Sequence, residues 1–134
     1  MSRFAQRVFT AAGVYGLLVL TPQYFIGPKL ARESPTGMTR PELFYGFIGV
    51  ALAWQFVFLR IGRQPQALRF LMPIAILEKL AFGLPVVVLY AQQRVDGSVL
   101  GFGLIDLVLA LLFAASWWKL RDAKLKLSLP VAVR

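Results

Sequence analysis

Two adjacent ionisable residues, Glu78 and Lys79, stand in the middle of residues 70–91, a stretch that is otherwise almost wholly apolar. A third, Asp106, stands within the apolar residues 99–118. A charged group at the centre of a membrane helix costs about 2.5–3.5 kcal/mol on insertion scales. Such groups therefore mark either a functional centre or a buried polar contact that holds helices together. Two carboxylates and an amine could form an ion-paired cluster, relay a proton, or act as an acid and a base.

The apolar stretches that carry these residues are long enough to cross a bilayer. Of the 134 residues, 58% are apolar and only 16% are charged, whereas about 25% of residues are charged in ordinary soluble domains. A spanning helix needs roughly 20 apolar residues, and four stretches meet or approach that length: 8–26, 43–59, 70–91 and 99–118. We therefore predict an all-α fold, a four-transmembrane-helix bundle in which residues 1–134 form a single integral membrane domain.

The depth of each polar residue follows from the rise of about 1.5 Å per residue in a helix. Counted from residue 70, Glu78 lies roughly 12 Å deep and Lys79 slightly deeper, and Gln55 in the second span falls at the same level. Asp106 lies about 6 Å from Lys79 along the bilayer normal. We expect Lys79 to bridge Glu78 and Asp106, with Gln55 and Trp54 supplying hydrogen bonds. The alternative is that the cluster only holds the helices in register, since buried ion pairs alone are weak evidence for stability or function.

The basic residues indicate membrane lipids as partners and argue against nucleic acid. The net charge is +9, but the basic residues flank the apolar spans instead of lining one helix face with interleaved aromatics. Ten of the 15 Lys and Arg residues lie before the first span, between the second and third, or after the fourth. By the positive-inside rule, both termini are predicted to be cytoplasmic.

The chain contains no cysteine and no histidine. Their absence excludes disulfides, thiol redox centres, and haem, iron–sulfur or zinc sites with Cys or His ligands. It also excludes a Ser-His-Asp triad. We therefore expect no metal site and no cofactor, and no catalytic residue can be assigned.

Small residues and one proline suggest how the helices pack. Membrane helices associate through close contact at small residues, and three pairs stand four residues apart: Ala12 and Gly16, Gly49 and Ala53, Ala110 and Ala114. We expect these pairs to form contacts within the bundle, and homo-oligomerisation stays open. Gly83 and Pro85 predict a kink in the third span, either as a simple bend or as a means of opening a cavity beside Glu78 and Lys79.

Three segments carry a resemblance to a known group of proteins: the run Pro41 to Gln55 (PELFYGFIGVALAWQ), Leu77-Glu78-Lys79, and Gly101-Phe102-Gly103-Leu104-Ile105-Asp106. In these segments the chain resembles a group of small bacterial four-helix membrane proteins, which are loosely similar to the DoxX-like class. The resemblance covers most of the chain in span count and connector placement. It implies a bacterial inner membrane location, and some DoxX-like proteins are linked to redox or quinone-associated membrane complexes. It transfers no catalytic residue.

Three classes of function remain open from the sequence. The first is an accessory subunit of a membrane-protein complex or a binder of an apolar small molecule such as a lipid or quinone. The second is a membrane enzyme that uses Glu78 or Asp106 as a proton donor or acceptor on a lipophilic substrate. The third is a small transporter or ion conductor, for which the expected inverted repeat is absent.

Overall fold

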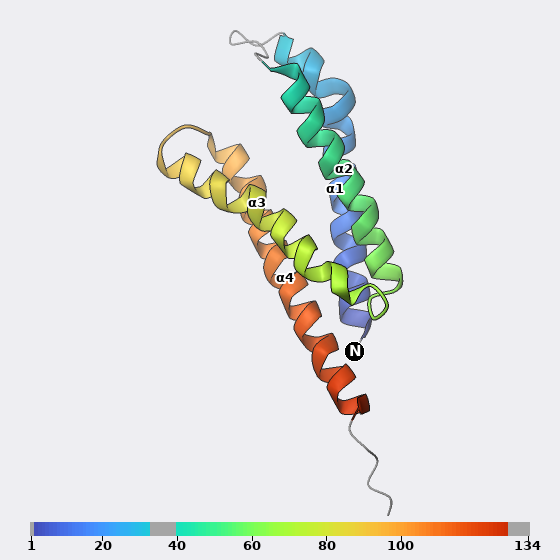
Figure 1. Ribbon diagram of the computed structural model, residues 1–134. Coiled ribbons are helices and arrows are strands. Elements are labelled where there is room, and N and C mark those ends of the chain that lie inside the picture. Colours follow the sequence, from blue (N-terminus) through green and yellow to red (C-terminus); the bar gives the residue numbers. More distant parts are fainter. Residues whose placement is uncertain (1, 33–39, 129–134) are drawn as a thin grey trace, which may run out of the picture.

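The fold consists of four helices arranged as two pairs. The computed structural model describes residues 2–32 and 40–128, with side-chain surroundings for 3–26 and 40–121. Its elements are α1 (Ser2–Arg32), α2 (Pro41–Arg63), α3 (Met72–Ala91) and α4 (Gly97–Ser128), and a short 3₁₀ turn, η1 (Arg69–Leu71), leads into α3 (Figure 1). No strand occurs in the described part of the chain. The predicted all-α bundle of four helices is confirmed.

Each helix contains a segment long and apolar enough to cross a membrane: Arg3–Ile26, Pro41–Arg63, Arg69–Ala91 and Gly97–Arg121. In an apolar stretch of 18 residues within each segment, only 17–22% of the residues are buried inside the bundle. Most of their side chains therefore face outward, as lipid-facing surfaces do, and the protein is a small integral membrane protein. Helices α1, α2 and α4 extend beyond the predicted spans, because residues such as Arg3 and Arg63 can continue a helix although they end an apolar run. Helix α3 instead begins at Met72, two residues inside its predicted span, because the 3₁₀ turn η1 precedes it.

The helices form two hairpins, α1 with α2 and α3 with α4, and packing within each hairpin is far more extensive than packing between them. The hairpins meet mainly through α1 and α4, while α2 and α3 touch little. Figure 1 shows that the hairpins converge near the start of α1 and diverge toward the α3–α4 turn. The start of α1, the α2–α3 connection and the end of α4 thus share one end of the bundle, which we call the basic end after Arg3, Arg7, Arg60, Arg63, Arg69, Lys119 and Arg121.

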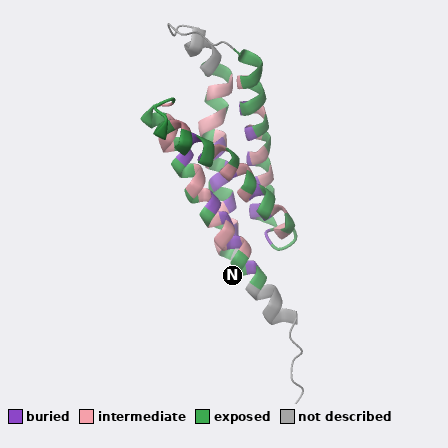
Figure 2. Ribbon diagram, turned by 60° about the vertical axis from the view of Figure 1, so that its left-hand side comes forward, coloured by how far each residue is buried: buried purple, intermediate pink, exposed green. Residues whose placement is uncertain are grey.

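The apolar core lies where the hairpins converge, and its centre is aromatic. The ring centroids of Phe9 and Phe113 are 4.2 Å apart and stacked, and those of Phe58 and Phe113 are 5.1 Å apart. All three side chains are fully buried, and buried positions follow the inner faces of the helices (Figure 2). This cluster joins α1, α2 and α4, so it fixes one hairpin against the other.

Within each hairpin, glycines allow the helix backbones to approach closely. A Cβ atom at Gly16 would lie within the Gln55 side chain, and one at Gly83 would lie 2.7 Å from Leu107 Cδ2 and 3.0 Å from the Gly103 carbonyl oxygen. Of the small residues predicted to form contacts, Ala12, Gly16 and Ala110 are buried, as expected. The expectation is wrong for Ala53, which is exposed because its face of α2 points away from α1.

The turn between α3 and α4 is defined by backbone hydrogen bonds and one cap. Gln93 follows α3 with a φ of 59°, and the amides of Gln93 and Arg94 donate to the carbonyl oxygens of Tyr90 and Leu89, the pattern of a Schellman motif. The Asp96 carboxylate then accepts a hydrogen bond of 3.1 Å from the Val99 amide and caps α4. This turn sets α4 against α3 and thereby positions Asp106.

Candidate ligand-binding site

The three intramembrane ionisable residues meet in one buried cluster. Lys79 Nζ donates a hydrogen bond of 3.3 Å to Asp106 Oδ1 and lies 3.6 Å from Glu78 Oε2. The exposed fractions of the three side chains are 6% for Lys79, 15% for Asp106 and 19% for Glu78. Lys79 therefore bridges the two carboxylates, one on its own helix and one on α4. Its ammonium also lies 5.1 Å from the centroid of the Phe58 ring on α2.

The local structure of the second hairpin explains this geometry. Glu78 and Lys79 are neighbours on α3 and so point in different directions around the helix. Lys79 faces α4, where close approach of the backbones at Gly83 brings Asp106 within reach. The ion pair therefore lies within the second hairpin. It is one helical turn along α3 from Gly83, where the backbones of α3 and α4 are in close contact.

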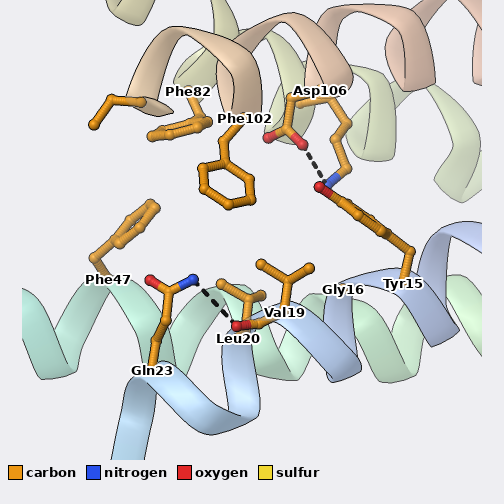
Figure 3. A pocket seen from close by; sticks show the side chains of 11 residues that line it. Tyr15, Gly16, Val19, Leu20, Gln23, Phe47, Phe82, Phe102 and Asp106 are labelled. Atoms are coloured by element: carbon orange, nitrogen blue, oxygen red, sulfur yellow. Dashed lines mark hydrogen bonds and ion pairs between the residues drawn. The ribbon is translucent and has the colours of Figure 1, made fainter. Parts of the chain in front are cut away.

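A cavity of about 240 Å³ lies beside the Lys79–Asp106 pair and is lined by residues of all four helices. Most of the wall is apolar and aromatic: Val19, Leu20, Phe47, Phe82, Val99 and Phe102. The side chain of Tyr15 points its hydroxyl toward the ion pair, and Phe82 and Phe102 lie across the cavity from α1 (Figure 3). Gln23 also lines the cavity, and its amide donates a hydrogen bond of 3.1 Å to the Val19 carbonyl oxygen.

A second cavity, of about 530 Å³, lies between α2 and α3. Its wall includes Val50, Trp54 and Glu78. Phe47 and Phe82 line both cavities, with ring centroids 5.5 Å apart. The two aromatic rings therefore stand between a compartment that contains Glu78 and one that contains Lys79 and Asp106.

Gln55 and Trp54, the two other residues predicted to belong to the cluster, form no hydrogen bond with it among the described residues. The Gln55 amide nitrogen donates a hydrogen bond of 2.7 Å to the Ala51 carbonyl oxygen, and its Oε1 is buried against Gly16 without a hydrogen-bond partner in the described part of the chain. The expectation that Gln55 supplies a hydrogen bond to the cluster is wrong, because its side chain lies on the α1-facing side of α2. Trp54 lines the second cavity with Glu78 and packs on Phe58, with ring centroids 6.1 Å apart.

The α1 residues of the first cavity were not predicted from the sequence. Tyr15, Val19 and Gln23 are spaced four residues apart and so lie on one face of α1. The presence of two polar residues, Tyr15 and Gln23, on one face of an apolar span is the sequence signal that could have identified this wall. The aromatic residues Phe47, Phe82 and Phe102 carried no such signal, because isolated aromatic residues are common throughout these spans.

The site combines an apolar chamber with a localised polar wall, which can hold an amphipathic small molecule or exchange a proton with one. Among the described residues, no three carboxylate, imidazole or thiol groups gather in a way that could hold a metal ion. No protein-family model, curated protein or solved structure matches this chain.

Proposed function

We propose that this integral membrane protein binds an apolar small molecule, such as a lipid or a quinone, through the Glu78–Lys79–Asp106 cluster. The observation that supports this most directly is the first cavity, in which all four helices contribute apolar walls around one buried ion pair. Small-molecule sites typically combine apolar and aromatic walls with a few polar groups that orient the ligand. An ion pair that served only to hold α3 against α4 would need no chamber beside it.

The size of the two cavities indicates how such a ligand is held. The first cavity, about 240 Å³, is slightly smaller than the range of roughly 300–1,000 Å³ common for ligand sites. It suits a ring, and the larger cavity between α2 and α3, whose wall includes Glu78, suits the rest of the molecule with its hydroxyl group. Because α2 and α3 touch little, a ligand can reach this second cavity from the lipid.

The polar group of the ligand is a hydrogen-bond donor in this proposal. With both carboxylates ionised, the cluster carries one negative charge, which disfavours an anionic headgroup. The Glu78 Oε2 atom is buried and has no hydrogen-bond partner in the described part of the chain. A hydroxyl group, such as that of a quinol or a neutral lipid, would satisfy an acceptor of this kind.

The cellular setting is also a proposal. The start of α1 and the end of α4 lie at the basic end, which the positive-inside rule assigns to the cytoplasm, with N-in/C-in topology. Together with the resemblance to DoxX-like proteins, this supports a bacterial inner membrane location.

The proposal is tested by native mass spectrometry of protein extracted with its surrounding lipids, without detergent. Val99→Phe places a ring in the first cavity, and Val108→Phe is the matched control, because Val108 is 55% exposed on the same helix. We expect the parent and Val108→Phe to retain one apolar molecule per chain, and Val99→Phe to lose most of it.

Two results would contradict the proposal. One is equal retention by Val99→Phe and the parent, and the other is the absence of any retained molecule from the parent. A stoichiometric protein partner in its place would support the alternative, an accessory subunit of a larger complex.

A further inference from the structure

A third cavity lies at the basic end, between α1 and α2 of the first hairpin. Its volume is about 440 Å³, and it is lined by Thr10 of α1 and by Phe56, Leu59, Arg60 and Arg63 of α2. It shares no residue with the two cavities of the ion-paired cluster. Any ligand of this cavity is therefore independent of the function proposed above.

The cavity residues of α2 are arranged in two levels along the helix. Arg60 follows Phe56 by four residues, and Arg63 follows Leu59 by four, so each arginine stands one turn, about 6 Å, beyond an apolar residue on the same face. Phe56 is 62% exposed although it is fully apolar. An apolar level followed by a cationic level matches a molecule with an acyl chain and an anionic headgroup.

The guanidinium groups of Arg60 and Arg63 differ from three other cations at the basic end, Arg69, Lys119 and Arg121, which are engaged within the bundle. Arg69 donates two hydrogen bonds of 3.1 Å to the Trp117 carbonyl oxygen and lies over its ring. Lys119 lies 3.8 Å from the centroid of the Phe4 ring, and Arg121 lies over Trp118. Arg60 and Arg63 have no ion pair with any described carboxylate. Both remain able to bind an anion.

The contact of α1 with α2 adds a hydroxyl group to this wall. A Cβ atom at Gly62 would lie 2.5 Å from Thr10 Oγ1 and 3.0 Å from the Thr10 amide nitrogen. The glycine between the two arginines therefore allows Thr10 to lie directly against the last turn of α2. A threonine hydroxyl is a hydrogen-bond donor that suits a phosphate oxygen.

We propose that this cavity binds the headgroup of one anionic phospholipid. The phosphate lies between Arg60 and Arg63, with the Thr10 hydroxyl as a further donor, and an acyl chain lies on Phe56 and Leu59. Arginine pairs phosphate in a bidentate manner, and basic pockets between membrane helices bind anionic lipid headgroups. The apolar level beneath the arginines favours a lipid over free phosphate, which would gain nothing from Phe56.

The test uses mixed vesicles in which phosphatidylcholine is the major lipid and phosphatidylglycerol the minor one. The protein is reconstituted, extracted into a mild detergent, and its retained lipids are counted by native mass spectrometry. We expect Arg60→Gln/Arg63→Gln to lower the ratio of retained phosphatidylglycerol to phosphatidylcholine at least about tenfold relative to the parent. Phe56→Ala is expected to lower phosphatidylglycerol retention while leaving the charge intact.

The matched control is Arg3→Gln/Arg121→Gln, which removes the same charge from the same end outside the cavity. We expect it to retain phosphatidylglycerol as the parent does. Equal losses in the two double variants would show only a diffuse attraction to basic residues and would overturn the proposal. Unchanged retention by Arg60→Gln/Arg63→Gln, or full displacement of the lipid by inorganic phosphate, would also overturn it.

Discussion

At the scale of single residues, the two carboxylates around Lys79 have different roles. Asp106 accepts a hydrogen bond from Lys79 and connects α4 to α3, whereas Glu78 lies on the same helix as Lys79 and is not hydrogen-bonded to it. A buried charge that loses its hydrogen-bonded partner stays desolvated and uncompensated. The stability of the second hairpin therefore depends on Asp106 more than on Glu78.

We expect Asp106→Asn to lower the free energy of unfolding by about 1.5–3 kcal/mol, the usual contribution of a hydrogen bond to a charged group. Glu78→Gln is expected to cost less. Glu42→Gln is the control, because Glu42 forms its ion pair with Arg40 at an exposed helix start and its loss should leave stability unchanged. The measurement is denaturant unfolding of each variant in detergent micelles. A larger loss for Glu78→Gln than for Asp106→Asn would contradict this assignment.

The sequence identified the residues of the ionisable cluster but not all of their neighbours. Glu78, Lys79 and Asp106 were detectable because charges are rare within apolar spans. The depth calculation predicted Gln55 at the level of Glu78, but depth along a helix says nothing about direction around it. Gln55 faces α1 and is packed against Gly16, which only the structure could show.

At the scale of helices, the shape of the second hairpin depends on the absence of a side chain at Gly83. The atoms that a Cβ would meet there include the backbone carbonyl oxygen of Gly103, which cannot move without moving α4. Any increase in the distance between α3 and α4 also separates Lys79 from Asp106.

We expect Gly83→Ala to lower the free energy of unfolding by about 1–3 kcal/mol, as overpacking in tight contacts usually does. Gly101→Ala is the matched control: no atom lies within 4 Å of its added Cβ, and alanine favours a helix by up to about 1 kcal/mol relative to glycine. Thermal unfolding of both variants measures the two effects. If Gly83→Ala proved as stable as Gly101→Ala, the close contact at Gly83 would not control the hairpin.

Hydropathy predicted the number and order of the helices, because the need to satisfy every backbone polar group makes a helix the only form for such apolar stretches. The ends were less predictable, since an apolar window stops at the first charges while the helix continues through them. The small-residue pairs were also insufficient. Their spacing showed that a close contact is possible but not which face of each helix makes it, as the exposed Ala53 demonstrates.

At the scale of the whole molecule, the charges define one end of the bundle and the divergence of the hairpins defines the other. The basic end could be predicted from the sequence, because it depends only on where basic residues fall along the chain. The divergence depends on the three-way contact of Phe9, Phe58 and Phe113, which holds the hairpins together at one end only. Nothing in the linear pattern distinguishes these phenylalanines from those that face lipid.

The absence of cysteine from the chain allows a direct test of orientation. Gln64 in the α2–α3 connection and Gln92 in the α3–α4 turn are both exposed and lie at opposite ends of α3. In intact cells stripped of their outer envelope, we expect a membrane-impermeant maleimide to label Gln92→Cys, and to label Gln64→Cys only after permeabilisation. Labelling of Gln64→Cys alone in unpermeabilised cells would reverse the N-in/C-in topology proposed here.

The pairing of helices into two hairpins has a consequence for the biogenesis of the protein. Lys79 and both of its carboxylate partners belong to the second hairpin, so these charges can neutralise one another as α3 and α4 enter the bilayer together. The energetic penalty of inserting them is thereby reduced before the first hairpin is needed. Docking of the two hairpins through the phenylalanine cluster then becomes a separate, later step, as in two-stage folding of membrane proteins. The order in which the helices leave the ribosome is thus also the order in which the molecule can be assembled.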